Sequence, residues 1–207
     1  PSPKTIATQQ IGYYDTPPYI FIIYLCAMPH PLLPFLYCPV CGARAFAVHD
    51  ARSRRCMSCG FTLYANASAS TVAVIVDAAG RLLCVRRERE PALGTLDLPG
   101  GFVDPGETLE AGCLREVREE TGLDVRIERY LFSLTNVYPF SGLDVHTTDS
   151  FFLCRPTDPL SAATVRAADD AADARWITPD HLEPALFGLR SIRCGVERLL
   201  ADRRWLE

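Results

Sequence analysis

Three glutamates in one predicted helix are the residues best suited to chemistry in this chain of 207 residues. At about 100° per residue, Glu116, Glu119 and Glu120 fall on one helix face. Carboxylates at this spacing repel one another, whereas Mg²⁺ binds carboxylate oxygens and is commonly shared with substrate phosphates. The pattern favours a divalent-metal site, although a solvated, glutamate-rich helix face would explain the fragment 115–120 taken alone.

The residues around these glutamates predict how the helix begins, ends and packs. Gly100 and Gly101 form a turn in which the backbone can approach a site closely, because no side chain blocks it. Thr108 is a suitable N-cap, and Gly122 stands where a helix end takes a left-handed residue. The packing face is expected to centre on the opposite side of the helix, at Ala111, Leu114 and Val117.

The string from this turn to the helix end resembles the Nudix box, G-x5-E-x7-R-E-U-x-E-E-x-G-U with U aliphatic, at every position. The matching residues are Gly101, Glu107, Arg115, Glu116, Val117, Glu119, Glu120, Gly122 and Leu123. Seven of these positions each require one residue type, so a chance match is below about one in a million at average residue usage. The chain is therefore similar to the Nudix hydrolase family.

This resemblance implies Mg²⁺- or Mn²⁺-dependent hydrolysis of a nucleoside diphosphate linked to another group. It makes Glu116, Glu119 and Glu120 metal ligands, with Glu116 also a candidate base. The Gly100 carbonyl is a further candidate ligand, and Gly101 belongs to the same cofactor-binding turn. Metal ions would neutralise the pyrophosphate and lower the pKa of the attacking water.

The resemblance also implies a pairing that holds the loop against the helix. The two residues concerned are Arg115 in the helix and Glu107 in the loop before it. Both are therefore counted with the three glutamates as candidate catalytic residues.

Two C-x2-C-G knuckles precede this region and are typical of a zinc ribbon over residues 36–66. Cys38 and Cys41 form the first knuckle, and Cys56 and Cys59 form the second. Four thiolates suit a closed, tetrahedral, structural Zn²⁺ site. Two disulfides or a redox pair are the alternatives. A segment this short has too little core to fold unaided, so the metal is expected to supply folding free energy.

Residues 1–35 are rich in proline and poor in charge, and we expect a flexible leader outside the fold. The formal net charge of −4 and the absence of a Lys/Arg run give no argument for nucleic acid. The apolar run 19–27 is too short to span a membrane as a helix. The remaining cysteines, expected to be small buried residues, agree with a reducing, cytoplasmic location; they are Cys26, Cys84, Cys113, Cys154 and Cys194.

From residue 67 to residue 207 the pattern predicts one α/β domain. Strands are expected at 71–76, 82–86, 96–98, 125–134, 145–154 and 174–178, and a terminal helix is expected at 191–200. This order suggests a mixed sheet covered on two faces. It agrees with the α/β/α sandwich that the Nudix resemblance implies.

Several acids after the box are candidates for substrate binding. Asp149 shares a strand face with mostly apolar residues, so it is expected to be functional or else bonded to an arginine or a backbone amide. The second group is Asp169, Asp170 and Asp173, in a region where Nudix enzymes often place a further acid. A solvated acidic loop is the alternative for that group.

The substrate class is suggested by the ribbon and by the stretch after the box. A ribbon before a Nudix box resembles the NADH pyrophosphatase branch, whose marker is S-Q-P-W-P-F-P-x-S. Ser133, Pro139 and Ser141 match this marker and Tyr138 keeps an aromatic residue, but its Gln, its Trp and its first two prolines are missing. Tyr138 and Phe140 can stack on a base, although aromatic residues at strand ends are more often part of the core.

We therefore expect a small-molecule nucleotide substrate such as ADP-ribose, NAD(H) or a similar dinucleotide. Neither nucleic acid nor a membrane is an expected partner, and a homodimer is left open. One alternative is a pyrophosphohydrolase that removes oxidised nucleoside triphosphates. The other is a non-catalytic binding or sensor protein that uses its zinc ribbon for docking.

Overall fold

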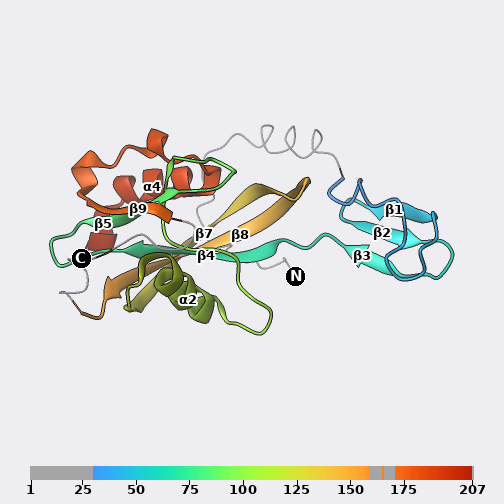
Figure 1. Cartoon of the computed structure of the whole chain (residues 1–207), viewed down its shortest axis with the longest axis horizontal. Coiled ribbons are helices and arrows are strands. Elements are labelled where there is room, and N and C mark those ends of the chain that lie inside the picture. The colour runs from blue at the N-terminus through green and yellow to red at the C-terminus, as the bar shows by residue number, and fades with distance from the viewer. Residues whose placement is uncertain (1–29, 159–164, 166–170, 207) are drawn as a thin grey trace, which may run out of the picture. The chain divides into compact units, whose positions relative to one another are not determined.

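The computed structural model describes residues 30–158, 165 and 171–206. It separates into two compact units, with the division between Tyr64 and Ala65 (Figure 1). Within the described residues, no helix is both long enough and apolar enough to cross a membrane.

The first unit is a small antiparallel sheet with the strand order β1-β2-β3. Its strands are β1 (Phe46–Asp50), β2 (Ser53–Cys56) and β3 (Thr62–Tyr64). Among the described residues, its buried apolar cluster consists of Cys38, Phe46 and Cys56, with four half-buried side chains packed around them; Leu32 is buried as well. Two of the three core residues are expected metal ligands, so little apolar burial remains to hold this unit together.

Residues 30–35 are bonded to this small sheet. The Arg54 guanidinium donates from Nη1 to the carbonyl oxygens of Leu32 and Leu33, both at 3.0 Å. The His30 Nε2 lies 2.8 Å from the carbonyl oxygen of Asp50. The fold of the first unit therefore begins earlier than the expected boundary at residue 36. Residues 1–29 of the expected leader lie outside the described residues.

The second unit contains two three-stranded sheets, one of them mixed. In the mixed sheet, with the order β4-β8-β7, β8 pairs in parallel with β4 and antiparallel with β7. The other sheet, with the order β6-β5-β9, is antiparallel. The strands are β4 (Ser68–Ile75), β5 (Leu82–Arg87), β6 (Leu96–Asp97), β7 (Val125–Phe140), β8 (Leu143–Pro156) and β9 (Ala171–Ile177).

Helices α2 (Leu109–Thr121) and α4 (Arg190–Ala201) lie on opposite sides of β4 and β8 (Figure 1). Side chains alternate along β4, so Val72 and Val74 join the core cluster beneath α4, whereas Ala73 and Ile75 join the cluster beneath α2. The expected α/β sandwich with a mixed sheet is confirmed. Short 3₁₀ helices complete the unit at Pro179–His181, Pro184–Leu186 and Arg203–Leu206.

The ends of α2 follow the sequence expectation, but its packing face does not. The Thr108 side chain accepts a hydrogen bond from the Ala111 N–H, and Gly122 is left-handed at φ 68°. The buried residues of the helix are Gly112, Cys113, Val117 and Thr121. Ala111 and Leu114, expected in the core, are exposed. The buried face is rotated toward the glutamates, because Glu116 and Glu120 face a loop and a cavity rather than open solvent.

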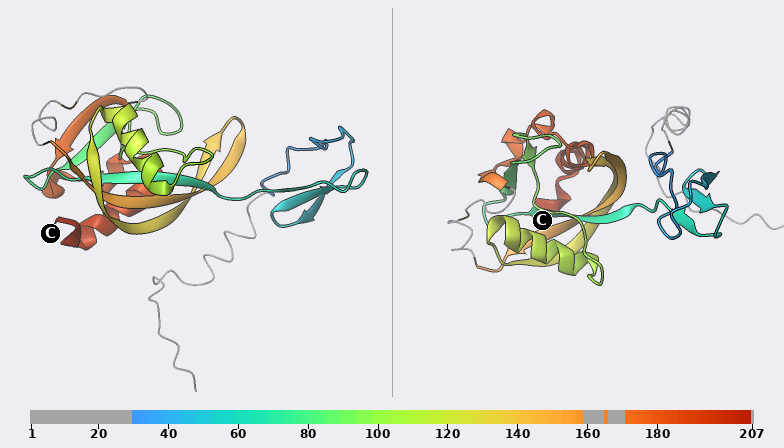
Figure 2. Two further views of the ribbon diagram at one scale, coloured as in Figure 1. Left: turned by 90° about the horizontal axis from the view of Figure 1, so that it is seen from below. Right: turned by 45° about the vertical axis from the view of Figure 1, so that its right-hand side comes forward.

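Strands β7 and β8 form one long, curved hairpin (Figure 2) that extends beyond the expected strand ends. The turn consists of Ser141 at φ 52° and Gly142 at φ 77°. Positive φ at both turn residues matches the twist of the flanking strands in a two-residue hairpin. The stretch after the Nudix box is therefore strand, and it presents Tyr138 and Phe140 on the same side of β7.

Candidate active site

The glycine turn before α2 is held against β4. The Thr71 N–H donates to the Gly101 carbonyl at 2.9 Å. A Cβ on Gly100 would lie 2.1 Å from the Thr71 carbonyl oxygen, and one on Gly101 would lie 2.6 Å from the carboxyl carbon of Glu116. Only glycine leaves room for these approaches, so the turn brings bare backbone next to a glutamate of α2.

Arg115 connects this turn with the glutamates of the helix. Its guanidinium binds Glu107 through two bonds, Nε to Oε1 at 2.8 Å and Nη2 to Oε2 at 2.9 Å. Its Nη1 donates to Glu116 at 2.8 Å and to Glu119 at 3.0 Å. Hydrogen bonding by Arg115 lowers the pKa of Glu107. The expected pair of Arg115 and Glu107 is present and ties the loop to the helix.

Glu120 and Glu116 lie in an environment that disfavours their ionised forms. Burial raises the pKa of Glu120 to about 8, and the negative charges of Asp97 and Glu116 act in the same direction. The Gly100 N–H donates to Glu120 Oε2 at 3.0 Å and opposes this shift. Burial also raises the pKa of Glu116. A divalent cation between two such carboxylates would favour their ionised forms, so this oxygen donor set fits Mg²⁺ or Mn²⁺.

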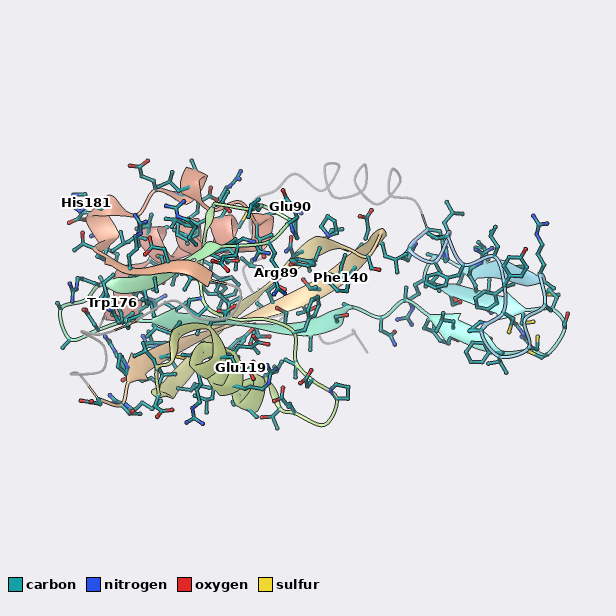
Figure 3. The ribbon with its side chains drawn as sticks, in the orientation of Figure 1. Arg89, Glu90, Glu119, Phe140, Trp176 and His181 are labelled. Carbon is teal, nitrogen blue, oxygen red and sulfur yellow. The ribbon has the colours of Figure 1, made fainter. Side chains whose placement is uncertain are left out.

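A cavity of about 350 Å³ opens beside these carboxylates. Its lining includes Glu116, Glu120, Gly100 and Gly101, and also Leu189 and Ile192 at the start of α4. Glu119 does not belong to this lining: its side chain is 49% exposed beside Arg115, on α2 (Figure 3). The structure thus brings two of the three expected metal ligands to the cavity, whereas the third, Glu119, is not among the residues that line it.

Aromatic side chains form another part of the cavity wall. Phe102 and Tyr138 meet edge to face, with ring centroids 5.7 Å apart, and Phe140 lies 6.4 Å beyond Tyr138. Phe140, at the end of β7, and Arg89, on the loop after β5, both line the cavity (Figure 3). The expected aromatic pair is therefore not part of the core, and Phe102 extends it to three rings.

A buried ion pair supports Tyr138, and the sequence analysis did not find it. Arg87 Nη1 lies 2.6 Å from Asp97 Oδ2, and Arg87 Nη2 donates to the Tyr138 hydroxyl at 3.0 Å. Both charged side chains are at most 15% exposed, and both line the cavity. The only sequence signal is the charged run 86–90 directly after a strand, which does not identify its partner ten residues later.

Asp149 is buried in the cavity wall, but its partners differ from those expected. Its Oδ1 accepts from the Thr147 hydroxyl at 2.6 Å and its Oδ2 from the Ser191 hydroxyl at 2.5 Å. Within the part of the chain that the structure describes, neither an arginine nor a backbone amide bonds to it. Asp169 and Asp170 lie outside the described residues, so their proposed role rests on sequence alone. Asp173 pairs with Arg175 and does not line the cavity.

The four knuckle cysteines of the first unit converge. Their sulfur atoms all lie within 4.8 Å of one another. Cys38 and Cys59 are 3.7 Å apart at sulfur, and Cys41 and Cys56 are 3.6 Å apart. A disulfide needs about 2.05 Å, whereas four Zn–S bonds of about 2.3 Å in a tetrahedron place sulfurs roughly 3.8 Å apart. The sulfur positions fit a tetrahedral metal ion and not two disulfides.

The contact between Gly101 and Glu116 gives a direct prediction. We expect Gly101→Ala to lower metal-dependent turnover by about 10- to 100-fold, because the new methyl group displaces the Glu116 carboxylate. Steady-state kinetics of Gly101→Ala, Glu116→Gln and the double variant measure this effect. If the alanine acts through Glu116, the two losses are not additive. Additive losses would show that Gly101 acts elsewhere.

Comparison with known proteins agrees with the fold. The NUDIX domain family matches residues 67–193. A NUDIX hydrolase of known structure from Nitrosomonas europaea superposes with a TM-score of 0.64 at 20% identity, over 81% of this chain and 91% of that one. The chain belongs to the NUDIX family.

Two curated relatives are similar to the chain over part of their length. It is 33% identical over 168 residues to the NAD-capped RNA hydrolase NudC of Stutzerimonas stutzeri, covering 81% of this chain and 56% of the relative. It is 31% identical over 115 residues to the ADP-ribose pyrophosphatase of Methanocaldococcus jannaschii, covering 55% of this chain and 63% of that protein. The chain thus spans less than two thirds of the length of either relative.

Proposed function

We propose that the protein hydrolyses the pyrophosphate bond of a nucleoside diphosphate linked to another group, with ADP-ribose and NAD(H) as the leading substrates. The observation that carries this proposal is the arrangement of the cavity. Two acids whose charged forms are disfavoured line it together with bare glycine backbone, and aromatic rings suited to a base line it as well. Relatives named for NAD-capped RNA and for ADP-ribose support the same substrate class.

In this proposal Glu116 and Glu120 hold the divalent cations, Mg²⁺ or Mn²⁺, and the Gly100 carbonyl and Glu119 are further candidate ligands. When bound, such ions neutralise the pyrophosphate and lower the pKa of a water molecule. Arg115 orients Glu116 and keeps the glycine turn against the helix. Because Glu116 and Glu120 line the cavity, an anionic pyrophosphate next to them would be repelled unless cations stood between it and these carboxylates.

The aromatic wall would hold the base of the substrate. Arg87 fixes the Tyr138 ring through its hydroxyl, so this ring is pre-oriented for stacking. Phe140 is 60% exposed and lines the cavity, so a base could cover it. In the first unit, the four cysteines would hold one structural Zn²⁺ ion, which suits a reducing compartment such as the cytoplasm.

A substrate panel with product identification by mass tests the proposal. With Mg²⁺ present, we expect ADP-ribose to yield AMP and ribose 5-phosphate, and NADH or NAD⁺ to yield AMP and the matching mononucleotide. FAD, NAD-capped RNA and oxidised dGTP complete the panel. Turnover of oxidised dGTP alone, with release of inorganic pyrophosphate, would replace this proposal by triphosphate sanitation. No turnover of any compound would favour a binding protein.

A further inference from the structure

The wall of the cavity that β7 and β8 form contains three polar side chains that the hydrolytic chemistry does not use. Asn136 is 6% exposed, and Thr147 and Asp149 are each 4% exposed, yet all three line the cavity. Asn136 pairs with Thr147 across the two strands, and Leu134 pairs with Asp149. Side chains of directly paired residues point to the same face, so Asn136 and Asp149 are diagonal neighbours on one face.

With its present partners, the Asp149 carboxylate can still accept hydrogen bonds but has none to donate. Both of its oxygens accept from hydroxyl groups, one from Thr147 and one from Ser191. A carboxylate has about four acceptor positions, so two of them remain after these bonds. Any ligand group that bonds to Asp149 must therefore be a hydrogen-bond donor. Asn136, in contrast, can both donate and accept.

The neighbours of this polar wall show which ligand it suits. Tyr138 is two residues from Asn136 on the same strand, so a flat ring that stacks on Tyr138 brings its edge toward Asn136 and Asp149. Diagonal neighbours across two strands are about 7–8 Å apart, which a purine can bridge. Burial in the wall means that a mismatched ligand leaves these polar groups without partners, which is costly.

We propose that Asn136 and Asp149 form a specificity-determining subsite that selects a nucleobase with an exocyclic amino group. Asp149 accepts from that amino group, and Asn136 bonds to the adjacent ring nitrogen. Adenine, the base of the proposed substrates, has both features. This inference rests on the proposed hydrolysis of a nucleoside diphosphate derivative. It adds which residues would select the base of that substrate.

The test compares ADP-ribose with its analogue in which hydrogen replaces the 6-amino group of adenine. We expect the wild-type protein to prefer ADP-ribose by about 10- to 100-fold in kcat/KM, since a hydrogen bond to a charged group is lost. We expect Asp149→Asn to bring the kcat/KM values of the two substrates within about twofold of each other, because only the value for ADP-ribose falls. Asn136→Ala is expected to lower both values by similar factors.

Ser191→Ala is the matched control. It removes one hydrogen bond to Asp149 but no residue of the cavity wall, so it is expected to lower the melting temperature and to keep the preference for ADP-ribose. The ratio of the two substrates on one enzyme is insensitive to partial unfolding. Equal turnover by the wild type, an unchanged preference in Asp149→Asn, or equal loss of both substrates in that variant would each overturn the subsite. If neither diphosphate is hydrolysed, the proposed function itself fails.

Discussion

Glu120→Gln is expected to reduce metal-dependent turnover by about 100-fold or more while the fold remains intact. The amide keeps the size of the side chain but replaces the carboxylate that faces the glycine turn at the cavity and that we propose as a metal ligand. Steady-state kinetics across a Mg²⁺ titration measure the loss. We expect kcat to fall at saturating metal, since the effect is on the reaction and not only on metal affinity.

The same variant makes a separate prediction about stability. Burial raises the pKa of Glu120 from 4.5 to about 8, so the folded protein retains a proton that the unfolded chain releases between these pH values. In magnesium-free buffer, wild-type stability is therefore expected to fall as the pH rises from about 4.5 to about 8. Glu120→Gln removes this contribution, so its melting temperature should exceed that of the wild type most clearly near pH 8.

Glu110→Gln is the matched control, because it makes the same chemical change on an exposed position in the first turn of α2. It is expected to leave both kinetics and the pH dependence of stability nearly unchanged. If Glu120→Gln retained more than about a tenth of the wild-type rate, Glu120 would not be an essential ligand.

The chemistry of the site was largely predictable from sequence because its parts are local. The pair of Arg115 and Glu107 spans only eight residues and follows from the order of the box. The packing face of α2 was predicted wrongly at Ala111 and Leu114, since helical periodicity centred it directly opposite the glutamates. The cavity beside Glu116 and Glu120 depends on strand pairing between distant segments.

The cavity wall illustrates why the remainder could not be predicted. Arg87 joins Asp97 and Tyr138, residues 10 and 51 positions away, and Ser191 reaches Asp149 over 42 positions. No periodicity reports such contacts. Asp149 was detected only because a carboxylate interrupts an apolar strand face, and the neighbouring Asn136 was missed because a lone amide within a strand is an ordinary residue.

The other large effect is expected in the first unit, where Cys56→Ser should abolish metal binding and local folding together. We expect the wild-type protein to contain one zinc ion per chain and the variant to contain almost none, as measured by elemental analysis. Amide exchange in residues 36–66 should become fast in the variant. The sulfur of Cys56 lies 3.6 Å from that of Cys41, so its loss opens a site that needs four ligands.

The size of this effect follows from how little else holds the unit together. Among the described residues, its buried apolar side chains apart from Phe46 and Leu32 are the expected ligands Cys38 and Cys56 themselves. Structural zinc binding contributes on the order of 10–16 kcal/mol in small zinc-binding peptides, far more than one buried phenylalanine and one buried leucine can supply. Ser58→Ala, an exposed change in the same knuckle, is the control and should keep the zinc. Purified wild-type protein that contains no zinc, or whose mass indicates two disulfides, would contradict the metal assignment. Retained amide protection in zinc-free Cys56→Ser would show that the sheet folds without the metal.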